Sequence, residues 1–244
     1  VRTVEQVPMD CKYTNPRISF DGKYWYLSVG VEQAQQPIEL TDETMGVDVG
    51  IKDLAVCSNG TVIKNINKTA KVRKLEKRLH RLQRSVSRKY EQNKEGNRFV
   101  KTGNIIKQEK EIRLLHRKLT NIRTNHLHQA TSKIVKTKPS TIVMEHLNIK
   151  GMMKNKHLSK AIAQQKLYEF KRQIQYKCEK YGVKFIEADK WFPSSKMCSG
   201  CGCVKKQLSL SERTYKCEEC SLEIDRDFNA SINLSRYELA IYSR

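Results

Sequence analysis

Four cysteines near the C-terminal end of the chain form two Cys-x-x-Cys pairs, Cys198/Cys201 and Cys217/Cys220, with fifteen residues between the pairs. Four thiolates at this spacing are typical of a zinc ribbon, in which each pair supplies two ligands from one tight turn. Four buried thiols or two disulfides are the alternatives, and Cys203 is a fifth candidate that could replace Cys201. Four thiolates leave no coordination position for a substrate, so we expect a structural Zn²⁺ here and the chemistry elsewhere.

The remaining cysteines, Cys11, Cys57 and Cys178, are isolated in the sequence, and we expect them to be small core residues. Cysteines spaced for metal rather than for disulfides favour a reducing, cytoplasmic compartment. No uncharged apolar run approaches the ~20 residues that span a bilayer. The start of the chain does not resemble a signal peptide, and no membrane partner is expected.

Positive charge is concentrated in one part of the chain. The sequence contains 47 Lys and Arg residues against 26 Asp and Glu residues, a net charge of +21. Residues 71–138 hold 21 Lys or Arg and 5 Glu, and so supply +16 of that total. Such a segment favours polyanions, nucleic acid above all, although a solvated helix face or a membrane surface is an alternative. The candidate phosphate contacts are Arg73, Lys74, Lys77, Arg78, Arg81, Arg84, Arg113, Arg117 and Lys118.

Alternation and turn residues predict the secondary structure around this segment. Asp21-Gly22 separates two β-prone runs and indicates a hairpin, and residues 33–43 are expected to be a linker. Two apolar stripes, residues 72–86 and 105–122, predict an antiparallel pair of helices whose outer faces are basic. Further strands are expected at 45–50, 54–57, 61–63, 138–145 and 183–187, and helices at 160–181 and from Asp227 onward. This order predicts an α/β fold with a mixed sheet of the ribonuclease H type.

Three acidic residues have the character of a metal site. Asp48 lies within an apolar strand, where burying an unpaired charge costs several kcal/mol, while Glu145 ends a strand and Asp227 opens the last helix. Carboxylates held on rigid elements can share two divalent cations ~4 Å apart. Taken singly, each acid has another explanation. Asp48 could be a charge at a bulge or sheet edge, Glu145 could point from the strand end into solvent, and Asp227 could be only a helix N-cap. Asp53, expected in a turn, and Asp225, expected to support the site or to cap the helix, are nearby alternatives.

Four sequence blocks together resemble the TnpB (OrfB) proteins of insertion sequences, relatives of the compact type V CRISPR effector nucleases. The blocks are Gly46–Ala55, Val143–Gly151, Trp191–Gly202 and Asp225–Ala230. The resemblance implies a RuvC nuclease with Asp48, Glu145 and Asp227 as catalytic residues holding two Mg²⁺ ions. It also implies a guide RNA, a target DNA and a location in the prokaryotic cytosol or nucleoid.

The resemblance also implies a domain order. Residues 1–44 correspond to the end of a wedge, or oligonucleotide-binding, β domain. Residues 45–190 correspond to the RuvC-like domain with the basic helical hairpin at 69–137, residues 191–223 to the zinc ribbon, and residues 224–244 to the closing helix. Family members usually carry a further ~100–200 N-terminal residues, the size of a separate domain. We expect that part to be truncated, encoded separately or supplied by a partner protomer.

Two other functions remain open at this stage. The chain could be a non-catalytic nucleic-acid-binding protein, either a truncated remnant or a regulator, or it could be a transposase that performs strand transfer on the same fold. Two aromatic clusters leave a similar choice. Tyr24, Trp25 and Tyr26 are expected to be core more often than base-stacking residues, and Trp191 and Phe192 are expected to wedge the ribbon against the nuclease domain.

Overall fold

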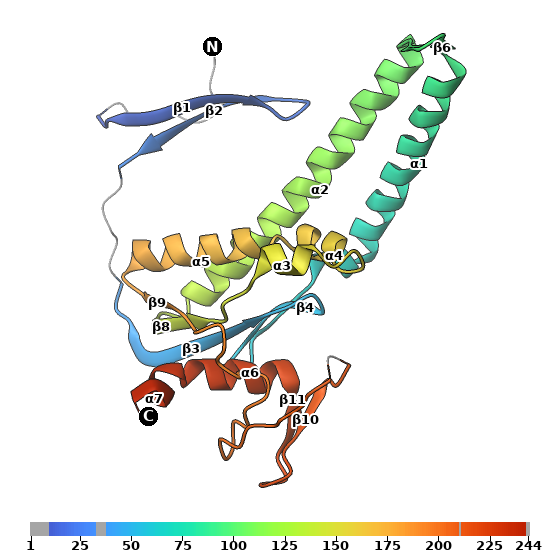
Figure 1. The fold of residues 1–244 in the computed structure, drawn as a ribbon. Helices are drawn as coiled ribbons and strands as arrows, with labels where there is room; N and C mark the ends of the chain where they lie inside the picture. Colours follow the sequence, from blue (N-terminus) through green and yellow to red (C-terminus); the bar gives the residue numbers. More distant parts are fainter. Residues whose placement is uncertain (1–9, 33–37, 210, 243–244) are drawn as a thin grey trace. The chain divides into compact units, whose positions relative to one another are not determined.

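The computed structural model describes residues 10–32, 38–209 and 211–242 (Figure 1). The chain divides into two compact units, and each is described by itself. The first unit comprises Val1–Ala34 and Ala70–Ile122, and the second comprises Gln35–Thr69 and Arg123–Arg244. Among the described residues, no helix has the length and apolar character that crossing a membrane requires.

The first unit begins with the predicted β-hairpin. Strands β1 (Tyr13–Phe20) and β2 (Trp25–Val31) pair antiparallel. Asp21 closes the turn, because its Oδ1 accepts hydrogen bonds from the backbone N–H groups of Lys23 at 3.0 Å and Tyr24 at 2.9 Å. The expectation that the aromatic residues are core is wrong for the described part of the chain, where Trp25 is 73% exposed. The physical reason is that this sheet has only two strands, and nearly all of their side chains are exposed.

A long helical hairpin forms the rest of the first unit, as the two apolar stripes predicted. Helix α1 (Ala70–Gln92) and helix α2 (Gly103–Val135) run antiparallel, joined through the short strands β6 (Lys94–Glu95) and β7 (Arg98–Phe99) (Figure 1). The buried residues of the seam are Val72, Leu79 and Val86 from α1 and Ile105, Leu115 and Leu119 from α2.

The second unit is built on a five-stranded sheet in the order β5-β4-β3-β8-β9. The strands are β3 (Thr41–Val49), β4 (Asp53–Cys57), β5 (Val62–Lys64), β8 (Pro139–Met144) and β9 (Lys184–Glu187). Strands β3, β8 and β9 are parallel, whereas β4 is antiparallel to both β3 and β5. The predicted mixed α/β sheet is therefore confirmed. Strand β3 begins earlier than expected, because residues 41–43 of the supposed linker extend beside the start of β8.

Helices cover both faces of this sheet (Figure 1). Helices α3 (Ile149–Met153), α4 (Ser159–Gln165), α5 (Leu167–Tyr181) and the C-terminal part of α2 lie on one face. On the opposite face lie α6 (Arg226–Ser235) and α7 (Tyr237–Tyr242). The larger core lies under α2, α4 and α5, and it includes Met45, Val47 and Val49 of β3. Side chains alternate along a strand, so Gly46 and Asp48 point to the α6 face.

The expected single helix at 160–181 is wrong, because the chain breaks at Lys166. This residue adopts a left-handed conformation with φ of 53° and separates α4 from α5. Polar contacts hold the break on both sides. The buried Gln165 donates from Nε2 to the carbonyl of Gly50 at 3.0 Å, and Lys166 donates from Nζ to Oγ1 of Thr124 at 3.0 Å. Periodicity alone does not report such tertiary contacts.

The cysteine-rich segment forms a small β structure between β9 and α6. Strands β10 (Thr214–Lys216) and β11 (Glu223–Asp225) pair antiparallel, and an isolated bridge joins Met197 to Val204. Strand β11 runs directly into α6, because Asp225 ends the strand and also caps the helix. Its Oδ1 accepts from the backbone N–H groups of Asp227 at 3.0 Å and Phe228 at 3.1 Å. The predicted capping role of Asp225 is thus confirmed.

Gly46 marks the point where α6 crosses β3. A Cβ atom added at Gly46 would lie 1.9 Å from the carbonyl oxygen of Ser231 and 2.4 Å from the backbone nitrogen of Ser235. A glycine within a strand often marks such a close approach of another backbone. No side-chain movement relieves an overlap with backbone, so α6 can pack this closely only on glycine.

We expect Gly46→Ala to destabilise the chain by about 3 kcal/mol, the upper range for overpacking, because α6 must shift away from the sheet. Thermal or urea unfolding measures the effect. Gly103→Ala is the matched control, since an added Cβ there meets nothing within 4 Å. If both variants melted at the wild-type temperature, the close packing of α6 on β3 would be incorrect.

Candidate functional site

The structure brings Asp48, Glu145 and Asp227 together, although they are far apart in the sequence. Asp48 lies on the α6 face of β3, and Glu145 directly follows the parallel neighbour β8, whose last residue, Met144, pairs with Val47. Asp227 is the second residue of α6, which packs on β3. Asp48 shares a hydrogen bond with Glu145 and interacts electrostatically with Asp227. All three side chains belong to half-buried residues.

Burial and the neighbouring carboxylates oppose the ionisation of Asp48. Burial, the charges of Glu145 and Asp227 and the hydrogen bond with Glu145 raise the pKa of Asp48 well above the ordinary aspartate value. Burial likewise raises the pKa of Glu145. The Arg226 guanidinium acts in the opposite direction on both groups. Clustered, partly desolvated carboxylate oxygens are the kind of donor that hard cations such as Mg²⁺ take.

Hydrogen bonds fix the loop that follows Asp48. The carbonyl of Gly50 accepts from the side chain of Gln165 at 3.0 Å. The carbonyl of Ile51 accepts from Asn65 at 2.8 Å, and that of Lys52 accepts from Lys68 at 2.7 Å. Lys52 also lies 3.5 Å from the helix-capping Asp225. The loop is therefore held from three directions. Asp53 is buried at the start of β4 rather than in a turn, and it pairs with Lys64 at 3.3 Å.

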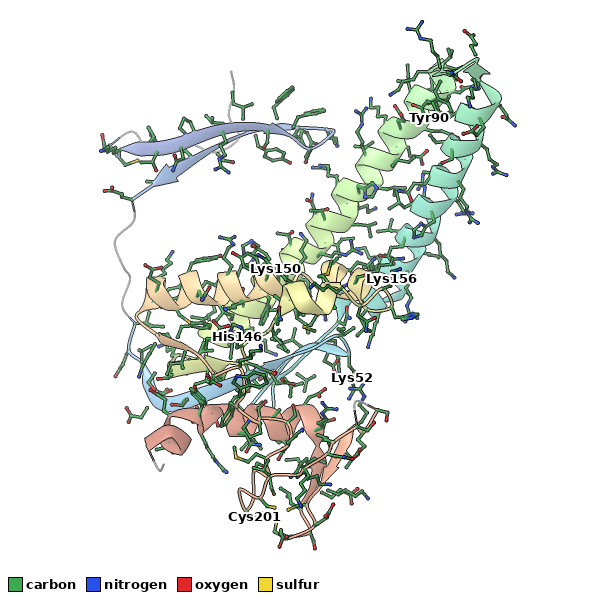
Figure 2. All side chains as sticks on the ribbon, viewed as in Figure 1. Lys52, Tyr90, His146, Lys150, Lys156 and Cys201 are labelled. Carbon is green, nitrogen blue, oxygen red and sulfur yellow. The ribbon has the colours of Figure 1, made fainter. Side chains whose placement is uncertain are left out.

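A second polar group joins the ends of β8 and β9, and sequence reasoning did not find it. Glu187, the last residue of β9, lies with Oε1 2.7 Å from Nδ1 of His146 and with Oε2 2.5 Å from Nζ of Lys171. His146 directly follows Glu145 in the sequence, so this group lies beside the end of β8. The only signal in the sequence was a histidine next to a strand-terminal carboxylate. Figure 2 shows His146 and Lys52 at the sheet and Cys201 in the cysteine-rich segment.

The four predicted zinc ligands converge in space. One ligand atom from each of Cys198, Cys201, Cys217 and Cys220 lies within 4.8 Å of the others, and Cys203 is outside this group. The Sγ atoms of Cys198 and Cys220 are 3.6 Å apart, and those of Cys201 and Cys217 are 3.5 Å apart. The backbone N–H groups of Cys220 and Glu219 lower the pKa of Cys217 to about 6. Four sulfurs so placed, one with a readily formed thiolate, fit a tetrahedral Zn²⁺.

The isolated cysteines differ from one another. Cys57 and Cys178 are buried, and burial raises the pKa of each to about 12, so the prediction that they are core residues is confirmed. The prediction of a core position is wrong for Cys11, because this residue is only partly buried.

Two asparagines of α6 attach the first cysteine pair to the helix that carries Asp227. Asn229 donates from Nδ2 to the carbonyl of Met197 at 2.7 Å and accepts from the backbone N–H of Ser199 at 2.9 Å. Asn233 donates to the same Met197 carbonyl at 2.6 Å and to Ser194 at 2.8 Å. Both asparagines are buried. The asparagine of the Asp-Arg-Asp-Phe-Asn-Ala block therefore has a structural role that the sequence alone did not reveal.

The nine predicted phosphate contacts lie on the helical hairpin of the first unit, and two of them are engaged within the protein. Arg117 pairs with Asp21, its guanidinium lies 5.0 Å from the centre of the Tyr24 ring, and it is mostly buried. Arg78 pairs with Glu111 but remains exposed. The other seven are exposed on α1 and α2: Arg73, Lys74, Lys77, Arg81, Arg84, Arg113 and Lys118.

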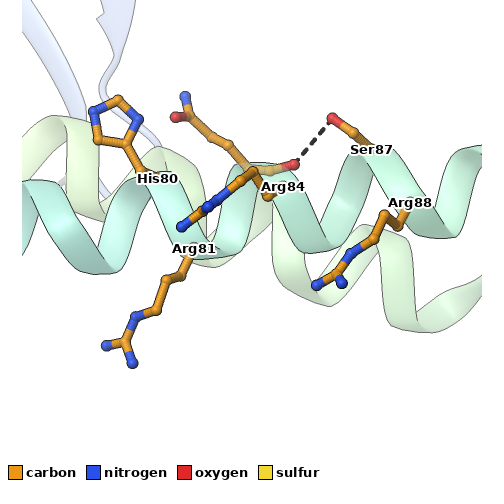
Figure 3. A pocket seen from close by; sticks show the side chains of 6 residues that line it. His80, Arg81, Arg84, Ser87 and Arg88 are labelled. Carbon is orange, nitrogen blue, oxygen red and sulfur yellow. Dashed lines mark hydrogen bonds between the residues drawn. The ribbon is translucent and has the colours of Figure 1, made fainter.

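One face of α1 carries a run of basic and polar side chains. Figure 3 shows Arg81, Arg84 and Arg88 extending from this helix, with His80 beside them. Ser87 donates to the carbonyl of Gln83 at 3.0 Å. Arg88 and His80 were absent from the predicted set, although the cationic helix pattern could have included them. Three guanidiniums along one helix face are suited to contact phosphates of a nucleic-acid strand.

Comparison with known proteins agrees with this arrangement. A family model for OrfB proteins of the IS605 type, described as "Probable transposase", matches residues 26–156. A second model, described as "Cas12f1-like, TNB domain", matches residues 168–234.

Two relatives and one solved structure define the extent of the similarity. A Streptomyces pristinaespiralis protein named "Putative RNA-guided DNA endonuclease" is 31% identical over 98% of this chain and 56% of its own length. A like-named protein of Mycobacterium tuberculosis is 36% identical over 84% of this chain and 44% of its own length. The structure of a Cas12f1–sgRNA–target DNA complex aligns with a TM-score of 0.61 and 21% identity, covering 93% of this chain and 46% of that one.

The chain thus spans about half the length of the curated relatives it matches. The protein of the solved complex shares the mixed α/β fold of this chain. The family match covers more than half of the chain and contains Asp48 and Glu145, while the second match contains Asp227 and all four clustered cysteines. The chain belongs to the TnpB (OrfB) family.

Proposed function

We propose that this chain is the nuclease-bearing part of an RNA-guided, Mg²⁺-dependent DNA endonuclease of transposon origin. The observation that carries the proposal is the convergence of Asp48, Glu145 and Asp227 on one face of the mixed sheet. The names of the relatives support the same activity class. A binding-only protein gains nothing from three acidic groups that repel each other and would repel phosphate.

The domain assignment is part of the proposal. Residues 45–190 would be a RuvC domain of the ribonuclease H type, interrupted by the basic hairpin at 69–137. Residues 191–223 would be the zinc ribbon, 224–244 the closing helix and 1–44 the end of a wedge domain. The strand directions are consistent with this fold, because β3, β8 and β9 are parallel and β4 is antiparallel to both of its neighbours, β3 and β5.

The residues of the site would act together in the proposed reaction. When bound, two Mg²⁺ ions would activate water and stabilise the leaving 3′ oxygen of the cut phosphodiester. The carboxylates of Asp48, Glu145 and Asp227 would together hold these ions. Arg226 offsets part of the negative charge of Asp48 and Glu145. The fixed backbone after Asp48 would hold its carboxylate oxygens in place without reorganisation during the reaction.

The basic hairpin would hold guide RNA or target DNA through phosphates, with little sequence information. Its exposed Arg and Lys residues on α1 and α2 support this role. The part that the relatives have and this chain does not span would contribute further guide contacts, either from the same polypeptide or from a partner protomer. Such a nuclease would act in the prokaryotic cytosol or nucleoid.

The chain purified with its RNA, together with the N-terminal region of a full-length relative, should cut DNA in Mg²⁺ at the sequence complementary to that RNA. Sequencing of the copurified RNA identifies the guide, and DNA cleavage is measured with matched and mismatched targets. Mismatched target DNA is the control, and it should remain uncut. DNA binding with no cleavage in Mg²⁺ would indicate a non-catalytic regulator, and joined DNA products would indicate a strand-transfer transposase. Either result would contradict the proposal.

A further inference from the structure

We propose that Trp191 and Lys190 form a nucleotide-binding platform beside the carboxylate site, on which an unpaired base of the DNA strand stacks. This inference rests on the proposed nuclease function, because it names the form of substrate that the site receives. It differs from the sequence-based expectation, in which Trp191 was a wedge within the protein.

The exposure of Trp191 is the first observation. This residue is 79% exposed, the largest exposed fraction among the large hydrophobic residues that the structure describes. Its neighbour Phe192 does pack as a wedge, edge-on against Tyr237 with ring centres 4.9 Å apart. The wedge prediction is therefore confirmed for Phe192 and wrong for Trp191. An indole this exposed leaves its ring available to stack on a ligand.

The backbone around Trp191 is fixed, which is the second observation. The backbone N–H of Trp191 donates to Oδ1 of Asp189 at 2.8 Å. The backbone N–H of Asp189 donates to the Tyr237 hydroxyl at 2.8 Å. The N–H of Phe192 donates to the Asp189 carbonyl at 3.0 Å. Beyond Pro193, the buried Ser194 accepts at its carbonyl from Asn233. The indole is thus presented from a braced loop rather than from a loose one, and stacking on it requires little ordering of the protein.

The position of the loop is the third observation. Strand β9 is parallel to β8, Met144 pairs with Glu187, and the N–H of Ala188 donates to the Met144 carbonyl at 2.8 Å. Ala188 therefore lies next to the strand end from which Glu145 projects. Trp191 is three residues further on, which places its Cα within about 10 Å of the Ala188 Cα. The platform and the carboxylates share the edge where parallel strands end.

The charge beside the indole defines the ligand. The ammonium group of Lys190 lies 4.7 Å from the centre of the Trp191 ring, and the lysine is exposed. An aromatic face with an adjacent cation is the combination with which proteins hold single strands, since the base stacks and the phosphate meets the cation. Bases paired within a duplex are stacked on each other and cannot use this platform. The expected ligand is therefore a single-stranded segment flanking the phosphate to be cut.

Tryptophan fluorescence tests the platform without any cleavage. The chain has two tryptophans, so Trp25→Phe leaves Trp191 as the only one. Because stacking places a base against the indole, we expect a single-stranded oligonucleotide, added in EDTA, to quench the emission of Trp191. An abasic oligonucleotide of the same length should bind, as followed by anisotropy of a labelled strand, and leave the emission unchanged. Binding of both strands without quenching by either would overturn the inference.

Cleavage kinetics provide the second test. Trp191→Ala should raise KM for single-stranded DNA by about tenfold with little change in kcat, and Trp191→Phe should restore most of the loss because phenylalanine also stacks. Tyr168→Ala is the matched control, since this exposed aromatic residue lies on α5. If the wild-type chain did not cut DNA, the proposed function would fail, and the quenching experiment would still decide the platform. If the wild-type chain cut DNA but the oligonucleotide caused no quenching, only the stacking role of Trp191 would be contradicted.

Discussion

Replacing Asp48 with asparagine should lower the rate of Mg²⁺-dependent DNA cleavage by at least about a thousandfold, because the metal-ion contribution to transition-state stabilisation is several kcal/mol. Asparagine keeps the size of the side chain and removes a charge that would help to hold the ions. The variant should still bind DNA, since the cationic residues of α1 and α2 are unaffected. Cleavage of a labelled single strand under single-turnover conditions measures the rate, and anisotropy measures binding.

The same substitution should stabilise the chain in EDTA. In the folded chain the pKa of Asp48 is raised, so the folded state retains this proton at pH values where the unfolded chain has already lost it. The stability of the wild type therefore falls as the pH rises above the ordinary aspartate pKa of about 4, and asparagine removes that dependence. At pH 7 we expect Asp48→Asn to melt about 2–4 °C above the wild type, which corresponds to about 1 kcal/mol. Added Mg²⁺ should narrow this difference, because it binds the wild-type carboxylates.

Asp53→Asn is the matched control for both measurements. Asp53 lies on the neighbouring strand and is the other acid that the sequence offered near Asp48. Its partner, Lys64, is largely exposed, so losing the ion pair should cost about 1 kcal/mol or less. Cleavage by Asp53→Asn should stay close to that of the wild type. An Asp48→Asn chain that cut DNA at the wild-type rate would show that these carboxylates are not the catalytic ones.

Local pattern was sufficient to predict most of the elements. The strand around Asp48, the two basic helices and the cysteine pairs each follow from spacing within one segment. The convergence of Asp48 with Glu145 and Asp227 was proposed from the positions of these acids and from the family resemblance, and the structure explains it by the parallel pairing of β3 with β8 and the packing of α6. The contact between Gly46 and the backbone of α6 was not predicted, since it depends on tertiary structure.

The errors have a common physical cause. Trp25 and Trp191 were expected to be buried because an aromatic residue in a β-prone or apolar segment is usually core. Whether such a residue is buried depends on whether another element covers it, and neither residue is covered in the part of the chain that the structure describes. The break at Lys166 and the attachment of Asn229 to the first cysteine pair depend likewise on contacts between segments distant in sequence. A single sequence reports apolar periodicity well but does not report which polar side chain meets which carbonyl.

Zinc loss should have consequences beyond the ribbon itself. Cys217→Ser should reduce the zinc content from about one ion per chain to a small fraction, because three thiolates do not complete the tetrahedron. Binding of a structural zinc contributes about 10–16 kcal/mol in zinc-finger peptides at pH 7, so the small β10–β11 structure should unfold without it. The carbonyl groups that Asn229 and Asn233 bind are those of Met197 and Ser194, just before the first cysteine pair. If the ribbon unfolds, these hydrogen bonds are lost and two buried amides of α6 are left unsatisfied.

We therefore expect the Cys217→Ser chain to melt at a lower temperature and to cut DNA more slowly, although Asp48 and Glu145 are untouched. Metal analysis of the purified chain measures zinc, and cleavage is compared at saturating Mg²⁺. Lowering the pH should release zinc from the wild type as well, because protons compete with the metal for thiolates. Cys203→Ser is the matched control: this cysteine lies outside the four-sulfur cluster and should keep both zinc and activity. If Cys217→Ser retained its zinc and its melting temperature, the cluster would not be a zinc site, and the position of α6 would depend on packing alone.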